Sequence, residues 1–245
     1  MPDEIEGKEA RMNVLLLAHT PEPEKICGIA ARLCYKNIDI EGACNSTPED
    51  IRRSLEACLR AGHMSVIEHA YFTFGIEGVS RALTHQLVRH RIASYSQQSQ
   101  RYVDESNFSF IIPPSIKGKP ELERKFVEAM RKIPYNEFAA SVPKEDARFI
   151  LPNACETKII LTMNARALYN FFELRLCSHA QWEIRMLAQK MLELVRAVAP
   201  LLFKYAGPPC AYRGICREKE PCPMFQAYGA RHAWADGGPS RLWKE

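Results

Sequence analysis

The sequence has no long apolar run and little excess of charge of one sign. No stretch approaches the ~20 consecutive apolar residues that a membrane-spanning helix needs. The beginning of the chain, from Met1 to Glu6, lacks the basic and apolar regions of a signal peptide. The net charge of +4 is small and dispersed, which is not typical of a nucleic-acid-binding scaffold. We therefore expect a cytoplasmic protein with neither a membrane nor a nucleic acid as its partner.

Several motifs of cofactor and metal sites are also missing. There is no Gly-x-Gly-x-x-Gly fingerprint and no repeating strand–helix pattern, so a Rossmann fold is not expected. His63, Glu68 and His69 form neither a His-Glu-x-x-His motif nor its reverse, and we predict no metal there. The nine cysteines are scattered, and several fall at apolar helical positions, which indicates reduced core residues.

The chain is long enough to form one domain with a sizeable core, since it has 245 residues and 47% hydrophobic content. The patterning predicts an α+β fold in which an antiparallel or mixed sheet packs with helices. Thr47 and Gly62 mark the ends of one helix, Ser80 begins another, and Ser178 with Gln181 resembles a capping box. Strands are expected over 14–17, 70–76, 108–112 and 158–163, and helices over 22–35, 48–61, from 80 to the arginine triplet, 120–140, 143–151, 165–177 and 179–198.

Arginine, serine and amide side chains are concentrated between Arg89 and Tyr102. Arginine presents a planar fork of donors that fits phosphate oxygens, and serine hydroxyls add neutral donors beside it. The triplet of Arg89, His90 and Arg91 falls at a predicted helix C-terminus, where the helix dipole favours cations. Successive helical side chains diverge by about 100°. The three side chains are therefore expected to contact different parts of a ligand, or different ligands.

Two further observations predict ligand contacts. Ser99 and Arg101 share one face if their segment is extended, which makes them the predicted phosphate clamp. The alternative for this segment is a solvated basic loop. Asn170 lies among apolar residues in the sequence, where an unpaired buried amide costs ~1–3 kcal/mol. It is therefore expected either to pair within the core or to meet a ligand.

The triplet, followed after seven intervening residues by Ser99, resembles the signature of the flavin-dependent thymidylate synthases. Further blocks resemble this family in the same order along the chain, and the resemblance covers about residues 12–206. We therefore predict a synthase domain over residues 1–206 and a tail over 207–245. The matching blocks are Gly62, His63, Met64, Ser65, Glu68 and His69 upstream, and Arg148 to Pro152, Asn164, Arg166, Asn170, Leu174, Arg175 and Ser178 to Glu183 downstream.

The resemblance implies an activity, a set of ligands and an assembly. Such enzymes convert deoxyuridylate (dUMP) to thymidylate (dTMP) with 5,10-methylenetetrahydrofolate as one-carbon donor and NADPH as reductant. Electrons pass through bound FAD, tetrahydrofolate is released, and no cysteine nucleophile is expected. The resemblance also implies the non-Rossmann fold of this family and a homotetramer whose sites are shared between subunits. A non-enzymatic nucleotide-phosphate-binding module is the alternative, but it would not explain Asn170, Arg175 and His179.

The resemblance also implies a role for each matching residue. Arg175 faces the uracil ring as the catalytic residue, because a guanidinium near the uracil carbonyl stabilises developing enolate charge. Ser99 could be a nucleophile, but no base is placed to activate it, so a phosphate ligand is preferred. The substrate-binding residues are Gln86, Gln97, Ser99, Arg101, Arg148 (from a neighbouring subunit) and Arg175, and the FAD-binding residues are His63, Ser65, Arg89, His90, Arg91, Gln97, Asn164, Asn170 and His179.

The tail contains three evenly spaced cysteines, Cys210, Cys216 and Cys222, followed by His232. Structural zinc sites usually combine closely paired cysteines with four ligands, and an interval of six does not match that pattern. A zinc site is thus the less favoured alternative here. We predict that the tail packs on the core or on a partner subunit and that the chain has no metal ligands.

Overall fold

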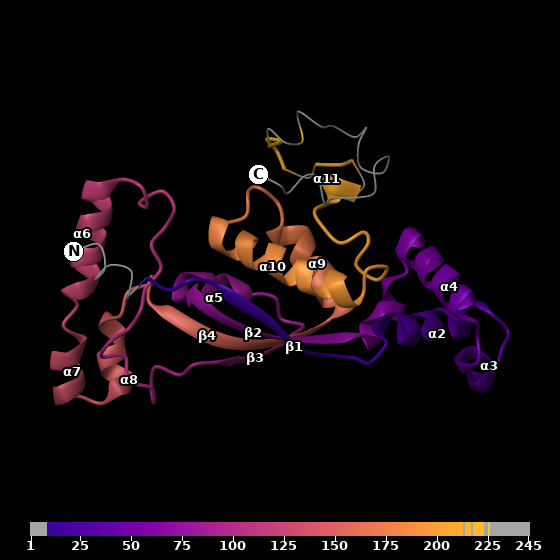
Figure 1. The fold of residues 1–245 in the computed structure, drawn as a ribbon, viewed down its shortest axis with the longest axis horizontal. Helices are drawn as coiled ribbons and strands as arrows, with labels where there is room; N and C mark the ends of the chain where they lie inside the picture. Colours follow the sequence, from indigo (N-terminus) through magenta and orange to yellow (C-terminus); the bar gives the residue numbers. More distant parts are fainter. Residues whose placement is uncertain (1–8, 213, 217, 223–224, 226–245) are drawn as a thin grey trace. The chain divides into compact units, whose positions relative to one another are not determined.

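The computed structural model of the chain describes residues 9–212, 214–216, 218–222 and 225. Its strands form one four-stranded sheet in the order β1-β2-β4-β3 (Figure 1). Helices accompany this sheet, so the predicted α+β class is confirmed. The strands are β1 (Asn13–His19), β2 (Tyr71–Ser80), β3 (Ser94–Gln97) and β4 (Glu156–Asn164).

The pairing of β1 with β2 is antiparallel, as predicted. At one end of the pair, the backbone amide of Thr20 donates to the carbonyl oxygen of Tyr71 at 3.0 Å. At the other end, Asn13 Nδ2 donates to Glu77 Oε1 at 2.9 Å. Residue numbers therefore rise along β1 as they fall along β2.

Strand β1 is exposed, whereas its apolar sequence predicted a buried strand. Leu15 and Leu17 are 54% and 52% exposed, and they lie two positions apart on one face of the strand. Tyr71 at the start of β2 is 51% exposed as well. An apolar run predicts that a strand is buried, but it does not distinguish burial within its own chain from burial against a second chain.

The chain divides into two compact units. The first unit comprises residues 1–14, 75–89 and 95–161, and the second comprises residues 15–74, 90–94 and 162–245. The predicted boundary at residue 206 remains a prediction. Within the described residues, no helix has the length and apolar character that crossing a bilayer requires.

The second unit contains most of the helices, and their ends follow local sequence signals. Thr47 Oγ1 accepts from the Asp50 amide at 3.2 Å, and Gly62 ends the same helix with φ of 75°. A Cβ on Gly28 would lie 2.3 Å from Ile51 Cγ2, so two helices approach closely there. The helices are α2 (Pro23–Tyr35), α3 (Ile40–Cys44), α4 (Pro48–Ala61), η1 (Met64–His69), α9 (Ala165–Arg175), α10 (Trp182–Val198) and α11 (Pro209–Tyr212).

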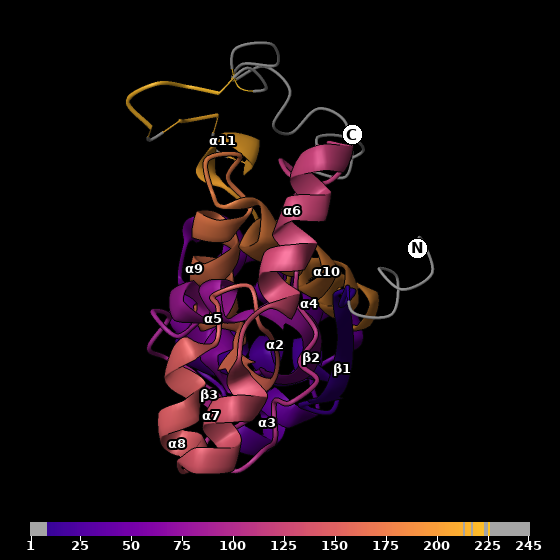
Figure 2. The same cartoon turned by 90° about the vertical axis from the view of Figure 1, so that its left-hand side faces the viewer.

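The first unit contains α5 and a group of helices between β3 and β4. In Figure 2, α6 stands above α7 and α8. Their apolar cluster is built around Phe110, Ile112 and Val127, with Phe108 and Phe126 packed against it. The helices are α5 (Arg81–Leu87), α6 (Pro120–Arg131), α7 (Tyr135–Ser141), α8 (Lys144–Ala147) and η2 (Arg148–Ile150).

Three predicted elements of the first unit are wrong in extent. The strand expected over 108–112 is reduced to isolated bridges at Phe110. The helix expected over 120–140 is two helices, because Pro134 lacks the amide hydrogen that a continuous helix needs. The helix expected over 143–151 shortens to α8 and the 3-10 turn η2.

The predicted capping box at residues 178 to 181 is also wrong. Helix α10 begins at Trp182, and Gln181 is itself the N-cap. Its Oε1 accepts from the amides of Glu183 and Ile184 at 2.9 and 3.1 Å. The long glutamine side chain reaches the first turn from one position before it, which the prediction did not consider.

Candidate active site

His90 is the buried member of the arginine triplet, and it forms the centre of a polar cluster in the second unit. Its Nε2 accepts a hydrogen bond from Arg175 Nε at 3.0 Å. Its ring lies edge-on to Phe171, with 5.0 Å between the ring centroids. Burial first, and the Arg175 guanidinium second, lower the pKa of His90 to about 4, against a smaller opposing effect of Asn170. The imidazole is therefore neutral at pH 7.

This pKa predicts an acid-sensitive fold. The folded-state pKa of about 4 lies below the ordinary value of 6.5, so between these values the unfolded chain binds a proton that the folded chain does not. Stability is therefore present above pH 6.5 and is lost as the pH falls through this window towards 4. At about 1.4 kcal/mol per pKa unit, the loss is about 3 kcal/mol.

Urea unfolding at about pH 7 and about pH 4.5 measures this loss. The control is His90→Gln, which keeps a polar group of similar size but does not titrate. The variant is expected to lose less stability than the parent over the same pH interval. Equal losses in the two proteins would assign the acid sensitivity to other groups.

Arg89 and Arg91 are both exposed, while His90 between them is buried. The triplet follows the end of α5 at Leu87 and is not helical, so the expected divergence of the three side chains stays a prediction. The two guanidinium groups remain open to solvent and to an anionic ligand. Arg175, at the end of α9, is half-buried, and burial lowers its pKa from the ordinary arginine value, which still leaves a cation at neutral pH.

Asn170 is exposed, so of its two expected roles the pairing within the core is wrong, and the contact with a ligand stays a prediction. On α9, the buried side chains are those of Leu168, Phe171 and Phe172. Asn170 follows Leu168 by about 200° around the helix and therefore faces away from the core. It hydrogen-bonds His90 and lines a cavity of about 400 Å³ in the second unit.

This cavity combines groups that suit an anionic, ring-bearing ligand. It lies between the end of α4 and one face of α9, and all its lining residues belong to the second unit. Cationic side chains can bind phosphate, while aromatic rings can stack on a planar group. The lining includes Arg60, Gly62, Met64, Arg166, Tyr169, Glu173 and Tyr205, and the two arginines pair with Glu56 and Glu68.

His63 and Ser65 are both exposed beside η1. The Tyr35 hydroxyl lies 2.7 Å from His63 Nδ1, and the two rings stack at 5.4 Å. Nearby, Glu68 pairs with Arg166 on α9. Glu68 is therefore held by an ion pair.

Asn164 and His179 lie at the two ends of the α9 region. Asn164 is the N-cap of α9, with its Oδ1 accepting from the Ala167 amide at 2.8 Å. Its side chain is buried, and the flavin contact expected of it stays a prediction. His179 is exposed, and its Nδ1 lies 3.8 Å from Cys177 Sγ.

Gln97 is held inward in the first unit. Its Nε2 donates to Thr84 Oγ1 at 3.1 Å and to Thr157 Oγ1 at 3.2 Å. These bonds join β3 to α5 and β4, which gives the amide a structural role beside any ligand contact. Gln86, also predicted to bind substrate, lies half-buried on α5.

Ser99 and Arg101 lie in a turn, so the extended segment expected for the phosphate clamp is wrong. Ser99 Oγ accepts from the Arg101 amide at 3.2 Å, and the Ser99 carbonyl oxygen accepts from the amides of Tyr102 and Val103. A short hydroxyl side chain competes here with strand pairing for the backbone amide. The two residues are nevertheless brought close together by the turn.

The Arg101 and Arg148 side chains converge on Glu145 within the first unit. Arg101 Nη2 lies 2.8 Å from Glu145 Oε2, and Arg148 Nε donates to the Glu145 carbonyl oxygen at 3.0 Å. The Arg101–Glu145 pair is half exposed, so it is weak and an anion can displace it. Glu145 thus contacts two arginines that are predicted to bind the substrate, one through its carboxylate and the other through its backbone carbonyl oxygen, and the phosphate clamp itself stays a prediction.

Arg81 and Glu145 are two neighbours of this clamp that the sequence interpretation missed. Arg81 Nη2 donates to the Gln98 carbonyl oxygen at 2.8 Å, which holds the loop before Ser99. Burial lowers the pKa of Arg81, and Arg148 adds to the lowering. Arg81 directly follows the Ser80 cap, so its helical position was predictable. Nothing in the sequence connects Glu145 to the clamp.

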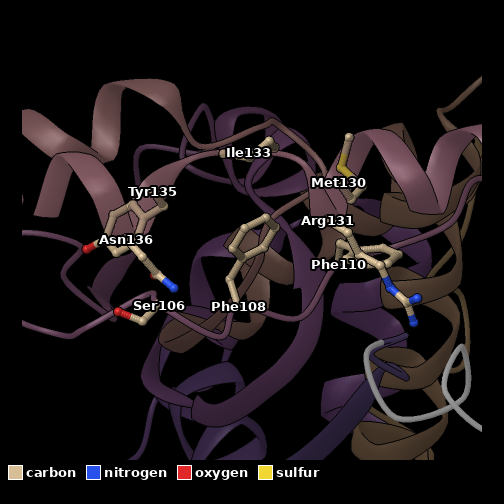
Figure 3. Close-up of a pocket in the computed structure, with 8 residues that line it drawn as sticks. All are labelled: Ser106, Phe108, Phe110, Met130, Arg131, Ile133, Tyr135 and Asn136. Atoms are coloured by element: carbon tan, nitrogen blue, oxygen red, sulfur yellow. The ribbon is translucent and has the colours of Figure 1, made fainter.

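The pocket in Figure 3 contains none of the predicted residues. It has a volume of about 150 Å³ and lies in the first unit. Figure 3 shows the rings of Phe108 and Tyr135 and the side chain of Met130 around it. Its lining combines Phe108, Phe110 and Met130 of the apolar cluster with polar residues such as Ser106 and Asn136, and we assign it no ligand.

The chain is similar to known proteins over a span that includes the predicted site residues. The chain matches the family described as "Thymidylate synthase complementing protein" over residues 15–201, a span that contains every predicted site residue. It is 48% identical over 234 residues to a flavin-dependent thymidylate synthase of Clostridium tetani, covering 87% of this chain and 94% of that protein. A protein of the same description from Geobacter sulfurreducens is 52% identical over 213 residues, covering 84% of this chain and 91% of that protein. One from Pyrococcus abyssi is 44% identical over 235 residues, covering 91% and 96%.

Proposed function

The chain belongs to the family of flavin-dependent thymidylate synthases, and we propose from the arrangement of its residues how it performs that activity. The enzyme uses a flavin and methylates dUMP to dTMP. The alternative, a non-enzymatic nucleotide-phosphate-binding module, is not supported. The similar proteins are flavin-dependent thymidylate synthases, and the matches cover 94% and 91% of their lengths. We propose further that the flavin is FAD, that NADPH is the reductant and that 5,10-methylenetetrahydrofolate supplies the carbon.

The observation that carries the substrate assignment is the turn that places Arg101 beside Ser99, with Glu145 in contact with both Arg101 and Arg148. A nucleotide phosphate requires cationic forks and neutral donors, and these residues supply both. The Glu145 carboxylate neutralises Arg101, so phosphate binding exchanges one carboxylate for a doubly charged phosphate. In the proposed homotetramer, each phosphate is bound by Ser99 and Arg101 of one chain and by Arg148 of a neighbouring chain.

The flavin assignment rests on the second unit. Its donors fit an anionic cofactor with a planar ring system, because exposed cations, neutral His90 and the Asn170 amide occur together there. The residues proposed to hold it are His63, Ser65, Arg91, His90, Asn164, Asn170 and His179, together with Arg89 and Gln97 of the first unit. When bound, the flavin supplies the two electrons that reduce the transferred one-carbon unit to a methyl group.

Arg175 acts on the uracil ring in this proposal. Carbon C5 becomes nucleophilic only as negative charge develops on the neighbouring carbonyl oxygen, and a fixed guanidinium stabilises that charge. The bond to His90 Nε2 fixes the Arg175 guanidinium through its Nε, which leaves both terminal nitrogens to face a ligand or other partners. A neutral His90 can accept this bond, whereas a protonated His90 would repel the guanidinium.

The proposed homotetramer rests on the exposed face of β1 and β2. Leu15, Leu17 and Tyr71 form an apolar surface of the second unit that a partner subunit could cover. Its substitution by charged residues would test this part of the proposal by gel filtration. Cytoplasmic localisation is likewise proposed from the sequence.

Thymidylate formation is the direct test of the function. The purified protein is incubated with FAD, NADPH, 5,10-methylenetetrahydrofolate and dUMP, and dTMP is measured by chromatography. Omission of NADPH, 5,10-methylenetetrahydrofolate or dUMP in turn should abolish the product, and so should removal of the bound flavin. Formation of dTMP without added NADPH, by fully oxidised protein under anaerobic conditions, would contradict the proposed source of electrons.

Ser99→Ala is expected to weaken dUMP binding while leaving measurable turnover. Loss of one neutral hydrogen bond costs about 0.5–1.5 kcal/mol, which corresponds to a rise of the dUMP KM of about 2- to 12-fold. Steady-state kinetics at varied dUMP measures this change. Ser96→Ala on the exposed side of β3 is the matched control. Complete loss of turnover with unchanged dUMP binding would instead assign Ser99 a role in the chemical step.

A further inference from the structure

Three side chains of different chemistry, each able to bind a metal, converge just after the end of α9. The Cys177 sulfur, a His179 ring nitrogen and a Glu218 carboxylate oxygen all lie within 4.8 Å of one another. Cys177 and His179 belong to the loop between α9 and α10, whereas Glu218 follows α11 in the C-terminal segment. All three residues lie in the second unit, and none belongs to the proposed phosphate clamp.

The loop that carries Cys177 and His179 is held by hydrogen bonds of its backbone. The Ala180 amide donates to the Cys177 carbonyl oxygen at 2.9 Å, which closes a turn around Ser178. Arg185 Nη1, on α10, donates to the Ser178 carbonyl oxygen at 2.6 Å. The turn therefore presents the thiol and the imidazole together, from positions already fixed by the protein.

A contact between α11 and α9 positions the segment that carries Glu218. The Tyr212 hydroxyl lies 3.5 Å from Glu173 Oε2, and Tyr212 shortly precedes Glu218 in the sequence. The family match ends at residue 201, so this carboxylate comes from beyond it. No sequence motif joins Glu218 to the loop, and the expectation of a chain without metal ligands did not consider this group.

The separation of the ligand atoms is close to that around a tetrahedral zinc ion. Zn–S and Zn–N bonds of about 2.3 and 2.0–2.1 Å place the sulfur and the nitrogen roughly 3.6 Å apart. Cys177 Sγ and His179 Nδ1 lie 3.8 Å apart. The His179 and Glu218 side chains are exposed, so rotation about their side-chain bonds can bring the carboxylate to the same separation.

The charges of the group match a divalent cation. Burial raises the pKa of Cys177, against the smaller opposing effect of a hydrogen bond from the His179 backbone amide, and the Glu218 carboxylate raises it further. The thiol is therefore protonated at neutral pH, and a bound metal takes the place of its proton. The resulting thiolate and the carboxylate carry two negative charges, which one zinc ion neutralises.

We propose that Cys177, His179 and Glu218 bind one zinc ion, which fastens the C-terminal segment to the loop between α9 and α10. Zinc accepts sulfur, nitrogen and oxygen ligands together, whereas magnesium and calcium require oxygen ligands. Three protein ligands leave the fourth tetrahedral position to a water molecule. On binding, the Cys177 thiol releases its proton to solvent and no electron is transferred. Coordination through His179 Nδ1 leaves Nε2 available for the flavin contact proposed above.

Equilibrium dialysis of the intact protein against buffered zinc, without a polyhistidine tag, tests the proposal. About one zinc ion per chain is expected to bind, more tightly as the pH rises, because the thiol must lose its proton. Glu218→Gln should weaken binding by at least about 100-fold, since loss of even an outer-shell partner costs about 10–100-fold. The matched control is Glu220→Gln, which changes a neighbouring exposed carboxylate and should bind zinc like the parent. Equal zinc affinity in Glu218→Gln and the parent would overturn the proposal.

Zinc-edge X-ray absorption on the zinc-bound parent protein identifies the ligands without any substitution. The expected shell combines sulfur at about 2.3 Å with nitrogen and oxygen at about 2.0–2.2 Å. A shell without sulfur, a shell of sulfur alone, or a parent protein that binds no zinc would each contradict the proposed site. None of these measurements depends on thymidylate synthesis, so failure of the zinc site and failure of the proposed function are distinguishable.

Discussion

Arg175→Ala is expected to lower kcat by about 10²–10³-fold, with a smaller change in the KM for dUMP. The loss reflects a fixed donor removed from the position where negative charge develops on the uracil ring, an effect of ~3–4 kcal/mol in comparable sites. Rapid-quench measurement of dTMP formation in a single turnover isolates this chemical step. Leu174→Ala, which changes an exposed neighbour on α9, is the control and should retain activity.

The same substitution is expected to act on His90. The Arg175 guanidinium is the second cause of the low His90 pKa, after burial, so its removal should raise that pKa from about 4 without restoring the ordinary value. Titration of the imidazole by NMR measures this shift. A full loss of kcat with no movement of the His90 pKa would mean that the hydrogen bond between them does not form in solution.

The double variant Arg101→Ala/Arg148→Ala is expected to raise the KM for dUMP by at least about 100-fold. Hydrogen bonds to charged groups contribute ~1.5–3 kcal/mol each, and this variant removes a cationic donor from each side of Glu145. Because the clamp is exposed, the KM of the parent should also rise with salt concentration, and that of the variant should rise less.

Arg124→Ala is the matched control for the clamp, since Arg124 is an exposed arginine that pairs with Glu128 on α6. Its KM for dUMP should stay at the parent value. Glu145→Gln offers a test in the opposite direction, because it frees Arg101 from its carboxylate partner and should lower the KM. A double variant with an unchanged KM but a lowered kcat would contradict the assignment of these arginines to the phosphate.

Local sequence signals predicted helix ends well. Thr47 and Gly62 fix α4 because a hydroxyl cap and a left-handed glycine act on the residues next to them. Ser80 and Asn164 act in the same way at the starts of α5 and α9. These interactions span three or four residues, so the sequence around each one contains the whole cause.

Interactions between residues far apart in the sequence could not be predicted from local signals. Asn170 follows apolar residues in sequence, but its exposed position depends on which face of α9 packs on the core. The carboxylate of Glu145 lies beside Arg101, which precedes it by 44 positions. The role of Gln97 in joining Thr84 to Thr157 likewise depends on sheet order.

The candidate site itself came mainly from the family resemblance. Spacing alone indicated a phosphate ligand near Ser99, but it gave the wrong local geometry, because the Ser99 hydroxyl captures the Arg101 amide in a turn. The role of a residue whose partners are distant in sequence can be predicted only from a related protein or from a structure.

The most direct test of the central claim is an anaerobic absorbance spectrum of the purified protein over ~300–500 nm, before and after addition of NADPH with dUMP. The account predicts flavin bands that bleach on reduction and return when 5,10-methylenetetrahydrofolate is added and dTMP forms. A colourless protein that stays colourless after incubation with FAD would contradict it.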